Sequence, residues 1–231
     1  MYEAVYAAPE GRSTPARFAR TAREYGYAGI VVRNADPEAD LEAVAEGYGI
    51  DVVSGTEIRV DDPQTASGHL GNRREEHTVL AVRGGTNALN RFAVEQDRVD
   101  VLTKPTSGDG DFNHVLAKAA ARNGVRVEID LSVALRLEGG RRVQALSNLR
   151  KLRELIEQYD APYVVSAAPE SHLQLRAPRE LLAVGERVGF SREAIREGLC
   201  EWGRLAERNR EIASESFIEP GVRRGRYEEN G

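Results

Sequence analysis

The sequence contains a single cysteine, Cys200, and no run of about 18 apolar residues of the kind that forms a transmembrane helix. One cysteine excludes an internal disulfide framework and a zinc site built from cysteines. The first residues, MYEAVYAAPEGR, lack a basic segment followed by an apolar core. We therefore expect no signal peptide, no association with a membrane and a cytoplasmic location.

Lysine is also scarce, because only Lys104, Lys118 and Lys151 occur among 32 basic residues. The planar fork of arginine suits phosphate better than lysine does, although a GC-rich genome would produce the same bias. The formal net charge of −5 argues against nonspecific nucleic-acid binding. However, an acidic, lysine-poor composition also fits a halophile, and high salt screens phosphate contacts. A nucleic-acid-binding protein from such an organism need not be strongly basic.

Seven short runs rich in Val and Ile predict β-strands. Near-continuous apolar runs of this kind are typical of strands that are buried on both faces, as in parallel sheets. The runs are residues 2–6, 29–33, 51–60, 77–83, 99–104, 126–131 and 163–167.

Helical patterns lie between most of these runs, and their start signals are Thr14, Asp36, Thr86, Asp111, Pro178 and Ser191. The longest periodic segment is 143–159, whereas the polar segment 61–76 is predicted to be a loop. Alternating strands and helices predict a parallel sheet. No glycine-rich dinucleotide fingerprint follows the first strand. We therefore predict an irregular TIM-like (β/α) barrel of about seven strands over residues 1–213, with a partly mobile tail, 214–231.

Fragments of a metal site are present. Barrel phosphoesterases of the polymerase-and-histidinol-phosphatase type collect histidine and carboxylate ligands from strand ends, and Glu57, His77 and Asp130 fit such positions. The first strand has no histidine, however, and the last strand ends without an Asp-His pair. A metal-dependent phosphoesterase is therefore kept as an alternative.

Covalent chemistry has little support in the sequence. Ser166 and His172 lie near each other, but no G-x-S-x-G elbow is present. Glu128 and Asp130 lie on one strand face, where carboxylates are often structural. An acid–base role for this pair stays open.

Basic residues end or follow five of the strand runs: Arg33, Arg59, Arg83, Lys104, Arg176 and Arg179. If the barrel closes, several of them would lie on one rim, where they could contact phosphates and position an RNA without reading its sequence. His114 and Lys118 share a helix face. The alternative is that these cations only keep charge in water and complement helix carboxyl termini.

Three segments carry a family resemblance: DVLTKPTSGDGDFNHVLAKAAARNGVRVEIDLS, YDAPYVVSAAPESHLQLRAPRELLAVGERVGF and FIEPGV. They resemble the archaeal ribonuclease P protein component 3 family, the counterpart of the eukaryotic thirty-kilodalton subunit. The resemblance covers residues 26–222. It departs from the family pattern where arginine replaces many expected lysines and where a long polar segment precedes His77.

The resemblance implies a TIM-like barrel that is related to the phosphoesterases but lacks their metal site. It implies a noncatalytic subunit of the ribonucleoprotein that removes the 5′ leader from precursor tRNA. The RNA subunit carries the catalytic magnesium ions, so no cofactor and no metal ligand are expected in the protein. The implied partners are ribonuclease P RNA, precursor tRNA, ribonuclease P protein component 2 and the other ribonuclease P proteins.

The residues that we expect to contact RNA are Arg176, Lys104, His114, Lys118, Arg122, Arg179 and Arg83. Arg176 is the strongest candidate because its fork can bind a phosphate through two hydrogen bonds, whereas His172 is expected only to brace its loop. A further alternative is a scaffold that binds protein partners through the apolar face of 143–159.

Overall fold

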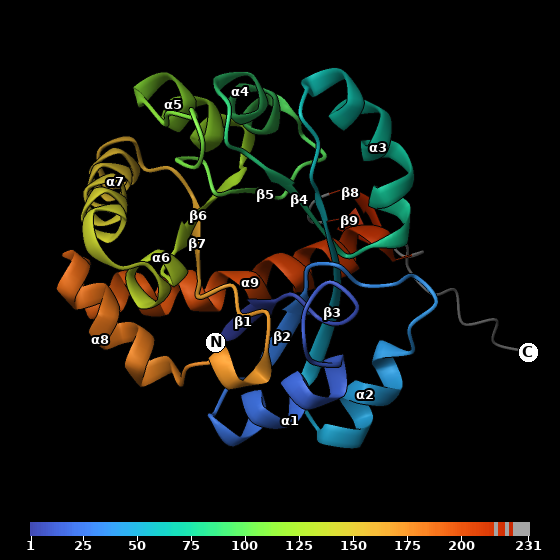
Figure 1. Ribbon diagram of the computed structural model, residues 1–231. Coiled ribbons are helices and arrows are strands. Elements are labelled where there is room, and N and C mark those ends of the chain that lie inside the picture. Colours follow the sequence, from blue (N-terminus) through green and yellow to red (C-terminus); the bar gives the residue numbers. More distant parts are fainter. Residues whose placement is uncertain (215–216, 220–221, 224–231) are drawn as a thin grey trace, which may run out of the picture.

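The computed structural model describes residues 1–214, 217–219 and 222–223. Within these residues, seven parallel strands form one sheet in chain order, and Figure 1 shows helices surrounding it as a barrel. All seven predicted strands and the predicted barrel are confirmed. The strands are β1 (Tyr2–Val5), β2 (Gly29–Val32), β3 (Asp51–Ile58), β4 (Val79–Arg83), β5 (Val101–Thr103), β6 (Arg126–Asp130) and β7 (Tyr163–Ser166).

Helices follow each strand, and a short antiparallel strand pair follows the last helix. The helices are α1 (Pro15–Glu24), α2 (Leu41–Tyr48), α3 (Pro63–Glu76), α4 (Asn87–Glu95), α5 (His114–Asn123), α6 (Ser132–Arg136), α7 (Gly139–Tyr159), α8 (Pro178–Val188) and α9 (Arg192–Ala213), with a 3₁₀ turn η1 (His172–Gln174). The strand pair is β8 (Phe217–Glu219) and β9 (Val222–Arg223). No helix of the described residues is long and apolar enough to cross a membrane.

The gap between β1 and β7 is spanned by a side chain rather than by strand pairing. The buried Glu3 carboxylate accepts hydrogen bonds from Ser166 Oγ at 2.5 Å and from the Ala167 amide at 3.1 Å. Burial raises the pKa of Glu3 to about 7, and these hydrogen bonds counteract the rise. From the α9 side, Trp202 Nε1 donates to the Val165 carbonyl at 2.9 Å. One side chain of β1 and one of α9 therefore complete the barrel wall.

Helix α9 also covers the end of the barrel where the strands begin, and in Figure 1 it crosses behind them. Trp202, Leu205 and Ala206 pack with interior residues of the strands in one apolar cluster. Farther along α9, Asn209 donates to the Thr78 carbonyl at 2.9 Å. This end is therefore occupied by the helix, and the loops after the strands surround the opposite end, called the mouth below.

Segment 61–76 is a helix, so its prediction as a loop was wrong. Asp62 caps α3 by accepting from the Thr65 amide at 2.9 Å, and Pro63 occupies the first turn. Ala66 and Leu70 are the buried residues of this helix. Because only two small contacts are made with the core, the segment has almost no amphipathic pattern, and its polar composition predicts a loop.

Two predicted caps were also wrong. Helix α2 is capped by Asp40, which accepts from the Ala43 amide at 2.8 Å, and not by Asp36. Helix α5 is capped by Asn113, which accepts from the Val115 amide at 3.0 Å. Asp111 instead pairs with Lys151 at 2.8 Å.

The apolar face predicted for 143–159 is only partly buried. Leu149, Leu152 and Ile156 pack into the core, whereas Val143 is 68% exposed. The short helix α6, which precedes α7, was not predicted. The expected mobility of the tail 214–231 falls mostly on residues outside the described ranges.

Candidate nucleic-acid interface

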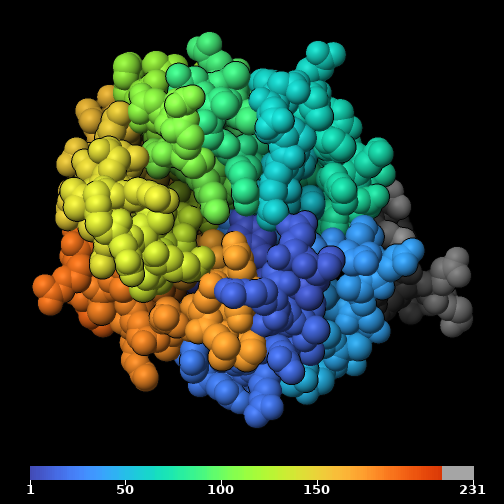
Figure 2. Space-filling view, viewed as in Figure 1, coloured from blue at the N-terminus to red at the C-terminus, as the bar shows by residue number. Residues whose placement is uncertain are grey.

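The loops after β7 and β1 lie side by side at the mouth. Figure 2 shows this face, with the segment after β7 in orange beside the segment after β1 in dark blue. The Arg12 amide donates to the Glu170 carbonyl at 2.6 Å, and the Tyr6 amide donates to the Pro169 carbonyl at 2.9 Å. A Cβ on Gly11 would lie 2.9 Å from the Glu170 carbonyl oxygen and 1.9 Å from that of Tyr6. Glycine at this position therefore permits the close contact between the two loops.

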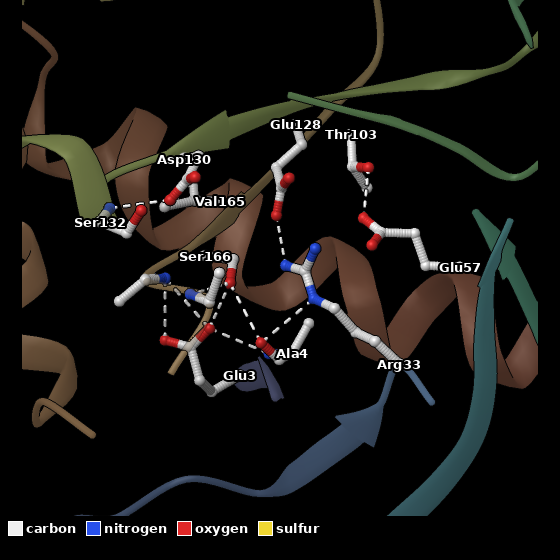
Figure 3. A network of polar contacts seen from close by, with 12 residues as sticks. Glu3, Ala4, Arg33, Glu57, Thr103, Glu128, Asp130, Ser132, Val165 and Ser166 are labelled. Atoms are coloured by element: carbon white, nitrogen blue, oxygen red, sulfur yellow. Dashed lines mark hydrogen bonds and ion pairs between the residues drawn. The ribbon is translucent and has the colours of Figure 1, made fainter. Parts of the chain in front are cut away.

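Arg33 lies inside the barrel and not on the rim, which corrects the sequence-based expectation. Its guanidinium pairs with Glu128, with the Arg33 and Glu128 side chains 2% and 0% exposed (Figure 3). Its Nε donates to the Ala4 carbonyl at 3.2 Å. The guanidinium carbon also lies 5.2 Å from the centre of the Tyr6 ring and 5.3 Å from that of Trp202. Arg33 is thus enclosed and cannot reach an RNA.

Glu57 is the centre of a second polar network, at the mouth itself. It accepts hydrogen bonds from Tyr6 Oη at 3.0 Å and Thr103 Oγ1 at 2.5 Å. Arg59 and Arg83 donate to it at 2.6 and 2.8 Å. Burial opposes ionisation of this carboxyl, but Arg33, Arg83 and the hydrogen bonds outweigh burial and lower its pKa to about 2. Arg59 and Arg83 therefore neutralise Glu57, and Arg83 is only partly accessible as an RNA contact.

The three residues of the phosphoesterase alternative do not meet. His77 lies before β4, at the end of the barrel covered by α9, where its Nδ1 lies 2.8 Å from Ser54 Oγ. Burial and the nearby Arg73 lower the pKa of His77. Glu57 lies at the mouth, near the end of β3, and its oxygens are directed at cations. Among the described residues, no group of three or more His, Cys, Asp or Glu side chains could hold a metal ion.

His172 ties the loop after β7 to the loop after β1. Its Nδ1 lies 2.8 Å from Ser13 Oγ, and its amide donates to the same oxygen at 3.0 Å. These contacts agree with the bracing role expected from the sequence. They also hold the backbone that carries Arg176, whose carbonyl accepts from Tyr27 Oη at 2.7 Å.

Arg176 is half-buried and has no carboxylate partner among the described residues. Its guanidinium donates to the carbonyls of Leu173 at 3.3 Å and Leu175 at 3.1 Å, both in its own loop. Arg179 follows it in the first turn of α8 and is exposed. The loop carbonyls orient Arg176 without neutralising its charge, so its remaining donors are available to an anion.

The other predicted residues are spread along α5 and the loop before it. Lys104 lines the mouth in the left-handed backbone region, with φ of 48°. His114 begins α5, with its ring centre 6.3 Å from that of Tyr159, and Lys118 Nζ lies 5.2 Å from the Tyr159 ring centre. Arg122 lies about two turns beyond His114 along α5, which places it about 12 Å from the start of the helix. It therefore belongs to the end of the barrel that α9 covers.

Sequence reasoning missed four exposed cations near the mouth: Arg12 and Arg17 after β1, and Arg141 and Arg142 in the first turn of α7. None of the four forms an ion pair within the described part of the chain. The loops after β2 and β3 instead carry exposed acids: Asp36, Glu38, Asp40, Asp61 and Asp62. The side of β7, β1 and α7 therefore carries unpaired arginines together with exposed acids such as Glu138 and Glu170, whereas the side of β2 and β3 carries exposed acids.

Comparison with known proteins places the chain in a family. The model of the family described as RNase P subunit p30 matches residues 1–213. The chain belongs to the RNase P subunit p30 family. A ribonuclease P protein component 3 from Haloarcula marismortui is 59% identical over 226 residues, which are 96% of each chain. The component 3 from Halobacterium salinarum is 54% identical over 231 residues, which are the whole of both chains. The resemblance identified from the sequence is confirmed.

Solved structures share the fold of this p30 family member. A chain of the cryo-EM structure of archaeal ribonuclease P with mature tRNA matches with a TM-score of 0.84, at 22% identity and over 99% of both chains. A zinc-bound histidinol phosphate phosphatase from Lactococcus lactis matches with a TM-score of 0.55, at 9% identity, over 82% of this chain and 94% of its own. The predicted relationship to phosphoesterase barrels is confirmed at the level of the fold.

Proposed function

We propose that this protein is a noncatalytic subunit of ribonuclease P and supports the RNA-catalysed removal of the 5′ leader from precursor tRNA. The observation that carries the proposal is the contrast at the mouth. Glu57 and Glu128 are already paired with arginines, whereas Arg12, Arg17, Arg176 and Arg179 have no acid partner. Such a surface suits binding to a polyanion better than acid–base chemistry.

The unpaired cations on the side of β7, β1 and α7 contact RNA phosphates in this proposal. Arg176 lies on one of two adjoining loops and Arg179 lies in the helical turn directly after it, and Arg12 and Arg17 lie on or directly after the other loop. The guanidinium fork matches two phosphate oxygens at once. Contacts of this type fix the position of an RNA without reading its sequence. Lys104, His114 and Lys118 extend the surface toward α5 and α7.

The catalytic magnesium ions belong to the RNA in this proposal, and the protein binds no cofactor of its own. Its further partners are ribonuclease P protein component 2 and the other protein subunits, together with precursor tRNA in the assembled enzyme. Assembly takes place in the cytoplasm. Family membership supports these partners, because the curated relatives are named as components of ribonuclease P.

Reconstitution tests the proposal. The protein is combined with its cognate RNA and partner subunits, and leader removal is followed across magnesium concentrations with and without the protein. We expect cleavage to require the RNA and to proceed at lower magnesium when the protein is present. Hydrolysis of phosphoesters by the protein and a metal alone would contradict the proposal, and so would a protein that leaves RNA-dependent cleavage unchanged.

A further inference from the structure

A cavity of about 370 Å³ opens at the mouth, between the loop after β5, the end of β6 and the helices α6 and α7. Val133, Leu137 and Leu149 contribute apolar surface to its walls. Glu128 and Asp130, at the end of β6, are the carboxylates that line it. Its volume lies at the lower end of the range for cavities that bind small ligands.

Both carboxylates have an oxygen without a hydrogen-bond donor. Glu128 is 1% exposed, and its Oε2 has no partner among the described residues because Arg33 binds Oε1. Asp130 is 7% exposed, and its Oδ1 accepts from the Ser132 amide at 2.8 Å (Figure 3). No described residue donates to Asp130 Oδ2. Of the two oxygens, Glu128 Oε2 is enclosed, whereas Asp130 Oδ2 is open to the cavity and can accept a hydrogen bond from an N–H donor of an occupant.

The charged side chains around the cavity restrict the net charge that an occupant with N–H donors can carry. Lys104 lines both this cavity and the neighbouring one at the centre of the mouth. Arg136, in the wall, donates to the carbonyls of Ala167 and Ala168 and keeps its charge. A cationic occupant would be repelled by these two side chains, and an anion would be repelled by the carboxylates. An occupant that combines a neutral N–H donor with an anionic group fits, because the donor can face the carboxylates and the anion can face Lys104 and Arg136.

We propose that this cavity receives one unstacked nucleotide of the RNA. The base donates from its Watson–Crick edge to Asp130, the apolar walls contact its faces, and its phosphate lies toward Lys104. Guanine suits the acceptors best because its N1–H and N2–H₂ groups are adjacent donors, whereas uracil has one N–H between two carbonyl oxygens that would face the carboxylates. Recognition of a splayed base by its edge is a common mode for single-stranded RNA.

This inference rests on the proposed function, because the nucleotide belongs to the RNA that the protein supports. The first test uses the full chain and two probes, GMP and UMP, with binding followed by chemical shifts of the cavity residues. We expect GMP to bind at least about tenfold more tightly than UMP, as one well-placed pair of hydrogen bonds provides. The variant Asp130→Asn should lose most of this preference, because its amide nitrogen replaces an acceptor. Equal binding of the two probes, or no binding, would overturn the inference.

The second test fills the cavity in the reconstituted enzyme. Ala145→Phe places a ring into the cavity from α7, and Ser147→Phe places the same ring on the exposed face of that helix. We expect Ala145→Phe to weaken binding of the RNA about tenfold, with Ser147→Phe unchanged and both proteins melting like the wild type. If Ala145→Phe does not fold, Asp130→Asn replaces it, with the same loss expected.

The two proposals fail in distinguishable ways. If the wild-type protein stimulates RNA-dependent cleavage and the cavity variants bind RNA as it does, the cavity inference is wrong and the proposed function stands. If the wild-type protein gives no stimulation, the proposed function itself is wrong.

Discussion

Arg33 and Arg176 each follow a strand of the same barrel, yet they lie in opposite environments. Arg33 is enclosed beside Glu128, whereas Arg176 lies on the loop after β7 and contacts only backbone carbonyls. A carboxylate partner decides the difference, because a buried cation is tolerated only when a paired acid and hydrogen bonds compensate for the lost water. The interior Arg33 thus supports the fold, whereas the rim arginines without an acid partner are the ones that contact RNA in the proposed function. Each prediction below tests one side of this contrast.

The largest effect is expected from Arg33→Met. Removal of the guanidinium leaves the Glu128 carboxylate buried without its partner, which should lower the free energy of unfolding by about 3–5 kcal/mol. Urea denaturation measures the change. The double variant Arg33→Met/Glu128→Met is the control and should recover much of the loss. A single variant as stable as the wild type would show that the interior pair does not support the fold.

The pH dependence of stability should report the ionised state of Glu57. Its pKa is lowered from 4.5 to about 2 in the folded protein. The stability that ionised Glu57 gives to the folded protein is therefore fully present above pH 4.5 and is lost as the pH falls toward about 2. The loss is about 3 kcal/mol from the size of the shift.

The variant Glu57→Gln sharpens this prediction, because it cannot ionise and should lack this part of the acid-induced loss. Unfolding curves recorded from pH 6 to pH 2 for both proteins provide the measurement. Parallel curves would mean that Arg59 and Arg83 do not neutralise Glu57, and those two cations would then be free for RNA.

Arg176→Ala should have a smaller effect on the fold and a clear effect on the assembled enzyme. The free energy of unfolding should change by less than about 0.5 kcal/mol, because the side chain fills no core position. The reconstituted enzyme should need more magnesium to cleave. The slope of the logarithm of the RNA-binding constant against the logarithm of the salt concentration should fall in magnitude by about one. Wild-type activity at every magnesium concentration would remove Arg176 from the interface.

The smallest effect is expected from Arg122→Ala. Arg122 is exposed like the rim cations, but it lies at the end of α5 that is far from the mouth. Its loss should change neither stability nor the magnesium requirement of cleavage. It is a matched control for Arg176→Ala, because each variant removes one arginine. A loss of activity equal to that of Arg176→Ala would show that RNA binding extends beyond the mouth.

The barrel could be predicted because buried parallel strands give unbroken apolar runs. Helix α3 could not, because its contact with the core is limited to Ala66 and Leu70. The rim could be predicted only in part. The sequence places Arg33 and Arg176 alike after strands, and only the three-dimensional position of Glu128, 95 residues from Arg33, separates them. Arg12 and Arg17 were missed because the turn at Gly11, which carries them to the mouth, depends on contact with Glu170.

The position of α9 has a consequence for the order of events during synthesis. Trp202 and its neighbours occupy the barrel interior and bond to β7, although β1 leaves the ribosome first. The ribosome adds about 5–20 residues per second, so the early strands wait for many seconds without their final contacts. Until the last helix emerges, the barrel interior lacks the contacts of Trp202, so in the proposed function the RNA can meet a finished binding surface only after translation is almost complete.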